Sequence, residues 1–243
     1  MQIIKNKIDD YFKDYNREAW LKIRKARYKQ IRDNNFYLNT DAETFKKEIL
    51  RFCEGDQVEG FSFRNSNIRK RSGGWIPFQD NNGQTVNGGE IMRELEADNL
   101  ELHGNYSWSM MYRGGDITVD MQKLKNTLDY LFDESIAIEK RFFEVVNING
   151  NYKIEGMGYG KASAFLHIKY PNKYGVWNSC TNGAFRILGV EINGENEGER
   201  YKNVNELLNE LLVKNKKSEQ NLNGFENLSD VDIFVWYVAN NLI

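Results

Sequence analysis

Residues 154–190 read IEGMGYGKASAFLHIKYPNKYGVWNSCTNGAFRILGV, and this stretch decides the predicted fold. Gly156 and Gly158 predict a tight turn, because glycine adopts positive φ and lets the backbone approach another group closely. A helix is expected from about 160 to 167, ending before Pro171. A second helix is expected to begin at Asn178, because asparagine is a favoured N-cap residue.

The start of the first of these helices has the chemistry of an anion site. The first amides of a helix have no intrahelical acceptor, so they suit an anion such as a DNA phosphate. We therefore predict that Gly156, Gly158 and Gly160 contact DNA through the backbone, with a charged contact from Lys161. A Gly-x-Gly turn alone is weak evidence, and its continuation to a second helix start at Asn178 raises its value.

With that continuation, the segment resembles the helix-hairpin-helix DNA glycosylase superfamily, whose members excise bases from DNA. In that family a hairpin of the type LPGVGxxTA precedes an apolar helix, and a catalytic aspartate then caps the next helix. Here Gly158 and Asn178 are 20 residues apart (178 − 158), and Asn178 stands at the position of that aspartate. The resemblance covers 154–190 only. It implies a two-domain all-α fold and a target nucleotide flipped out of the duplex.

Three departures from the family pattern bear on the chemistry. Gly160 stands where strand-cutting members have a lyase lysine, and Lys161 is one residue further, about 100° round the helix. Glu155 replaces the hairpin proline. Asn178 carries no negative charge for the oxocarbenium-like state of glycosidic cleavage, and such a loss costs about 10²- to 10³-fold in rate. We therefore expect weakened catalysis at Asn178, unless another carboxylate substitutes: Asp116, Asp120, Asp230 or Asp232.

Several other side chains have both a functional and a structural interpretation. A flipped base could be held by four aromatic residues, which could equally fill a helical core: Trp75, Trp108, Tyr112 and Trp177. His167, on the apolar helix, is interpreted as a hydrogen-bonded core histidine. Cys180 lies in the first helical turn after Asn178, where the helix N-terminus can lower a thiol pKa, but a structural role is the simpler interpretation.

The whole chain is predicted to be mainly α, with two helical subdomains flanking a cleft. Only two prolines occur in 243 residues, which suits helices. Apolar spacing predicts helices over 3–33, 120–132 and 136–146, a loop over 191–199, a helix around 204–212, and a last helix capped by Ser229. We divide the chain into an N-terminal helical and loop region (1–118), a glycosylase-like core (119–190) and C-terminal helices packing back on the N-terminal region (191–243).

Charge is balanced overall, at 33 basic and 35 acidic residues, but it is unevenly distributed. Seven basic residues and one acidic residue lie between 17 and 32, and a second basic group is expected to contact DNA: Arg64, Arg69, Lys70 and Arg71. A solvated helix face is the alternative interpretation of such stretches. With no apolar run of about 18 residues and a charged start, we expect neither a membrane span nor a secretory signal, and a cytoplasmic protein.

No cofactor or metal is expected. Cys53 and Cys180 are too few for an iron–sulfur cluster, and His103 and His167 cannot supply a three-histidine zinc site. Three functions stay open. The first is a DNA-binding protein that recognises a modified or damaged base with excision weakened or absent, working beside an enzyme that acts on abasic sites. The second is an active DNA N-glycosylase without lyase activity, acting on an unusual base in repair or defence. The third is a helical protein-interaction adaptor.

Overall fold

The protein is mainly helical. The computed structural model describes residues 2–13, 57–58, 61–62, 117, 119–220 and 223–239. Its helices are α1 (Gln2–Lys13), α7 (Met121–Phe132), α8 (Ile138–Val146), α9 (Tyr159–Lys169), α10 (Ser179–Leu188), α11 (Glu197–Lys214) and α12 (Leu228–Ala239). Two short strands, β1 (Gln57–Val58) and β2 (Phe61–Ser62), pair antiparallel with Gln57 opposite Ser62.

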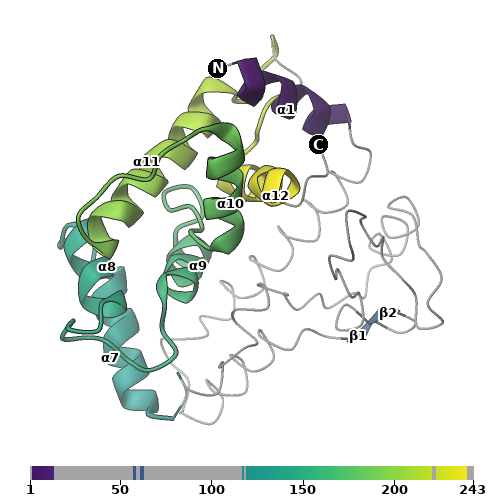
Figure 1. Cartoon of the computed structure of the whole chain (residues 1–243). Coiled ribbons are helices and arrows are strands. Elements are labelled where there is room, and N and C mark those ends of the chain that lie inside the picture. The colour runs from purple at the N-terminus through teal and green to yellow at the C-terminus, as the bar shows by residue number, and fades with distance from the viewer. Residues whose placement is uncertain are drawn as a thin grey trace, which may run out of the picture.

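Helix α9 is the central helix of the described part. Every residue from Lys161 to Ile168 is buried, as expected for a helix that is surrounded on all sides. It contacts α7 and α8, and Figure 1 shows it between α8 and α10, with α11 along the outer side. Helix α11 packs along α8, and α10 packs against α12. The helices that follow residue 190 therefore pack directly against helices of the 119–190 segment.

The first helix is attached to the last one. Tyr11 of α1 is fully buried, and its hydroxyl donates to the carboxylate of Asp230 on α12. Its ring makes edge contacts with Phe234 at 5.6 Å and Tyr237 at 5.2 Å between centroids. Burial of these aromatic rings ties the N-terminal helix to the C-terminal one.

Side-chain caps mark the starts of α7 and α10. Asp120 caps α7, accepting a hydrogen bond from the amide of Lys123. Asn178 caps α10, as its sequence position predicts. The helices expected over 120–132 and 136–146 are both present, the second from Ile138.

Two expected boundaries were wrong. Ser229 is not a cap, because α12 begins at Leu228 and Asn227 accepts from the amides of Ser229 and Asp230. The loop expected over 191–199 ends early, because α11 begins at Glu197 beneath an Asn196 cap. Acidic residues in this first turn are favourable next to the positive end of the helix dipole.

Candidate nucleic-acid interface

The predicted turn before α9 is present and is anchored from below. Ile154 and Met157 are buried, and the Met157 amide donates to the Ile154 carbonyl at 3.2 Å. Gly156 has φ 77°, a conformation that disfavours a side chain. Glu155 and Gly158 face solvent. The two buried side chains fix the turn to the core while its outer edge stays accessible.

Helix α9 begins without a side-chain cap. Gly158 is its N-cap, in extended conformation with φ −101° and ψ 178°, and it offers no side-chain acceptor. Within the described ranges, the amides of Gly158, Tyr159 and Gly160 have no hydrogen-bond acceptor. A Cβ added at Gly158 would meet nothing within 4 Å. Glycine at this position is therefore not required by the packing or backbone of the described residues.

Lys161 lies inside the turn. Its side chain is 6% exposed, and its ammonium donates to the Gly156 carbonyl at 2.7 Å. This contact stabilises the left-handed turn from within.

The connection between α9 and α10 is held in place by α11. The Asn205 side chain accepts from the Gly175 amide at 2.8 Å and donates to the Lys173 carbonyl at 3.1 Å. The Tyr201 hydroxyl donates to the Gly175 carbonyl at 3.0 Å. A Cβ at Gly175 would lie 2.4 Å from Leu208 Cδ1, so the connection sits directly on α11. Sequence analysis missed this clamp, because asparagines on a helix give no signal of a long-range partner.

Side chains from α9 and α10 hold the rest of the connection. The Ser163 hydroxyl donates to the Trp177 carbonyl at 3.1 Å, and its oxygen accepts from the Trp177 amide at 2.9 Å. The Thr181 hydroxyl donates to the Val176 carbonyl at 2.9 Å. Three helices thus determine where the backbone of residue 178 lies, which is how a precisely placed site is built.

Asn178 is half-buried and uses its side-chain oxygen as a cap. Oδ1 accepts from the amides of Cys180 at 2.8 Å and Thr181 at 3.1 Å. The Thr181 hydroxyl oxygen in turn accepts from the Asn178 amide at 3.1 Å, which completes a capping box. The outward chemistry of Asn178 is therefore that of its NH₂ group, a donor.

Trp177 connects the two helix starts. It is 5% exposed, its ring lies 4.5 Å from that of Tyr159 and 6.1 Å from that of Phe142, and its indole NH donates to Asn182. Trp177 therefore lies within the core, as the structural interpretation of this aromatic residue predicts. Tyr159 is half-buried beside it, at the first position of α9. It is a site residue that sequence analysis missed, although an aromatic directly after Gly158 was a visible signal.

His167 is the core histidine that was expected. Its Nδ1 lies 2.7 Å from the Tyr174 carbonyl, so it carries the proton and donates. Its Nε2 lies 3.0 Å from the Ser229 hydroxyl, so both ring nitrogens have a buried partner. Cys180 is half-buried in the first turn of α10.

The substitute carboxylates are differently placed. Asp120 is exposed and caps α7. Asp230 is fully buried and accepts from Tyr11 and from the Glu226 amide, and Asp232 is 6% exposed. Eight predicted site residues lie outside the described residues: Arg64, Arg69, Lys70, Arg71, Trp75, Trp108, Tyr112 and Asp116.

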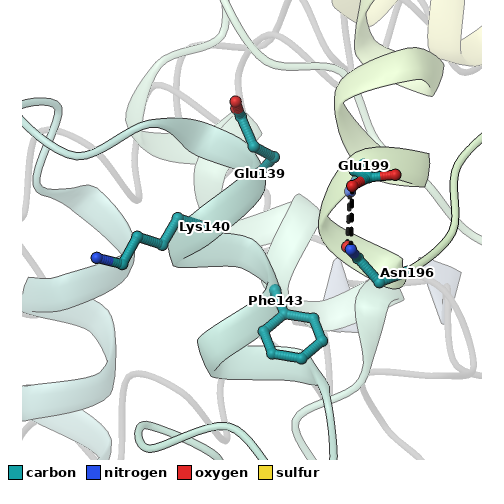
Figure 2. A pocket seen from close by; sticks show the side chains of 5 residues that line it. All are labelled: Glu139, Lys140, Phe143, Asn196 and Glu199. Atoms are coloured by element: carbon teal, nitrogen blue, oxygen red, sulfur yellow. Dashed lines mark hydrogen bonds between the residues drawn. The ribbon is translucent and has the colours of Figure 1, made fainter.

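A depression of about 200 Å³ lies elsewhere, between α8 and α11 (Figure 2). Its lining residues are Glu139, Lys140, Phe143, Asn196 and Glu199, none of which is a predicted site residue. In the parts of the chain that are described, no group of three or more histidine, cysteine or acidic residues could hold a metal ion. No described helix is both long and apolar enough to cross a membrane.

Comparisons with known proteins give no further information about this site. No family model, characterised protein or solved structure matches the chain. The site is therefore interpreted from its own residues.

Proposed function

We propose that this protein binds DNA through a glycosylase-like helix-hairpin-helix element and recognises a modified or damaged base, flipped out of the duplex, with excision weakened or absent. One observation carries the proposal: Gly158, Tyr159 and Gly160 present consecutive amides at an uncapped helix start, and the Tyr159 ring contacts that of Trp177, which directly precedes Asn178. An enzyme acting on abasic sites is the partner that this function implies.

In this proposal the affinity for DNA comes from the amides of Gly158, Tyr159 and Gly160, which we call the hairpin amides. A phosphate accepts hydrogen bonds from successive backbone amides and is favoured by the positive end of the helix dipole. Gly158 leaves open space where a side chain would stand between the backbone and a phosphate. The ring contact between Tyr159 and Trp177 joins this phosphate site to the segment that carries Asn178.

Asn178 favours recognition over excision. Its Oδ1 already accepts two amide hydrogen bonds and is not a base, so it is poorly suited to activate water. Its NH₂ group donates hydrogen bonds to a sugar or base but brings no negative charge to an oxocarbenium-like state. Binding without efficient cleavage is the combination that this chemistry supports.

The experiment measures binding and base excision on the same DNAs. Duplexes that carry different modified bases are titrated with the full chain at several salt concentrations, then treated with alkali, which breaks the strand at abasic sites. We expect salt-dependent binding and little breakage. Asn178→Asp restores a carboxylate while keeping an N-cap residue, so breakage is expected to increase in this variant.

Two outcomes overturn the proposal. Strong strand breakage by the unmodified protein that Asn178→Ala abolishes makes it an active N-glycosylase. If the folded protein does not bind DNA even at low salt, the helical protein-interaction adaptor is the function that remains.

A further inference from the structure

Two lysines donate hydrogen bonds to the successive carbonyls of Gly156 and Met157, in the hairpin formed by the turn at 154–158 and the start of α9. The ammonium of Lys153 donates to the carbonyl of Val146, at the C-terminus of α8, at 2.9 Å and also to the carbonyl of Met157. The ammonium of Lys161 donates to the carbonyl of Gly156 at 2.7 Å. Lys153 belongs to the loop between α8 and α9, whereas Lys161 belongs to α9, so the hairpin is held from both sides.

These contacts fix the direction of the amides. In a trans peptide the C=O and N–H bonds point in opposite directions, and no described peptide bond is cis. Because the Met157 carbonyl points toward Lys153, the Gly158 amide points away from Lys153. The amides of Tyr159 and Gly160, at the start of α9, follow it in sequence. Without Lys153, the peptide between Met157 and Gly158 would be free to rotate and carry the Gly158 amide inward.

We propose that Lys153 and Lys161 are positioning residues for the phosphate site: they hold the hairpin so that the amides of Gly158–Gly160 face a DNA phosphodiester, and they place two positive charges behind it. The inference rests on the proposed function. It explains the burial of Lys161 and gives Lys153, whose sequence position carries no motif, a defined part in binding.

The protonation of Lys153 is expected to change when DNA binds, and this change can be measured. Burial lowers the pKa of Lys153, and Glu197 of α11 opposes that shift. Glu197 is itself held by the Asn147 side chain and also interacts with Arg200. A phosphate in front of the hairpin favours the charged ammonium, so DNA binding raises the pKa of Lys153. By linkage, DNA binding then takes up protons in the alkaline range below the ordinary lysine pKa of about 10.4.

The test compares Lys153→Met, Lys153→Arg and Lys161→Met in the full chain, with a 20-base-pair duplex as probe. Lys214→Met is the matched control, because Lys214 is exposed at the end of α11 and pairs only with Glu210 among the described residues. We expect Lys153→Met and Lys161→Met to weaken binding by about tenfold or more. Lys153→Arg and Lys214→Met are expected to stay within about threefold.

Two readouts separate positioning from direct contact and from a purely structural role. The slope of log affinity against log salt is expected to stay unchanged in Lys153→Met, because this ammonium does not itself displace counterions from a phosphate. Calorimetry at alkaline pH in buffers of different ionisation enthalpy is expected to show proton uptake for the unmodified protein and none for Lys153→Arg. This second measurement does not depend on the two methionine variants.

Failure of the inference is distinguishable from failure of the proposed function. If the unmodified protein binds DNA, but folded Lys153→Met and Lys161→Met bind equally well, or Lys153→Arg keeps the proton uptake, the positioning role is wrong. If the unmodified protein does not bind DNA at low salt, the proposed function is wrong and the positioning role is overturned with it.

Discussion

Replacing Gly158 by alanine separates DNA binding from folding. The added methyl would project into space that is empty for 4 Å, at the start of α9. The backbone angles of Gly158, φ −101° and ψ 178°, suit any L-residue. We therefore expect the variant to fold normally and to lose affinity for DNA.

The expected magnitudes differ for the two properties. Alanine is a poorer N-cap than glycine by up to about 1 kcal/mol, and the lower entropy of the unfolded chain offsets about 0.4–1 kcal/mol of that. The net change in unfolding free energy is therefore below about 1 kcal/mol. A hydrogen bond to a charged group contributes about 1.5–3 kcal/mol, so a methyl that displaces one phosphate contact weakens binding by about 10- to 100-fold.

The matched control is Gly175→Ala, for which we expect the opposite result: a loss of stability rather than a loss of DNA affinity. Its Cβ would lie 2.4 Å from Leu208 Cδ1, and Leu208 is 2% exposed and has little room to move. Overpacking of this kind costs about 1–3 kcal/mol of stability. Urea unfolding gives the stability of both variants, and fluorescence anisotropy with a labelled duplex gives their affinity. A folded Gly158→Ala protein with unchanged DNA affinity would refute the assignment of the hairpin amides to phosphate binding.

Three further predictions concern Glu155, Ser163 and Glu134. Glu155→Gln is expected to strengthen DNA binding a few-fold at low salt, because an exposed carboxylate beside the hairpin repels phosphate; equal affinity in a salt titration argues against contact there. Ser163→Ala is expected to lower the unfolding free energy by about 1–3 kcal/mol, measured by urea denaturation, because the amide and carbonyl of Trp177 lose their buried partner. The hydrogen bond from Lys173 lowers the pKa of Glu134, so this pair stabilises the protein above the ordinary glutamate pKa and stops doing so as pH falls through the lowered value. Because the pair is largely exposed, Glu134→Gln is expected to remove less than about 1 kcal/mol of acid-sensitive stability, and an unchanged acid limb of the unfolding curve would contradict this.

Features that depend on neighbouring residues could be predicted from the sequence. Asn178 was recognised as a cap because an N-cap bonds to amides two or three residues further along. The turn at Gly156 could be predicted for the same local reason. Ser229 misled because a better cap, Asn227, stands two residues earlier and because the Ser229 hydroxyl binds His167, 62 residues away.

Features that depend on tertiary contacts could not be predicted. Lys161 looked like a surface cation, and only the fold places its ammonium against the carbonyl of Gly156. Trp177 carried signals for a base pocket and for the core, and its ring contacts place it in the core. The clamp of Asn205 on Gly175 joins residues 30 positions apart, which no local pattern announces.

The most direct measurement of the central claim is a titration of ¹⁵N-labelled protein with duplex DNA, followed through the amide resonances of Gly158, Tyr159 and Gly160. We expect these three resonances to shift together and to saturate at the affinity measured by anisotropy, while the amides of Cys180 and Thr181, already bonded to Asn178, shift less. Unmoved resonances at Gly158–Gly160 in a protein that is saturated with DNA would contradict it.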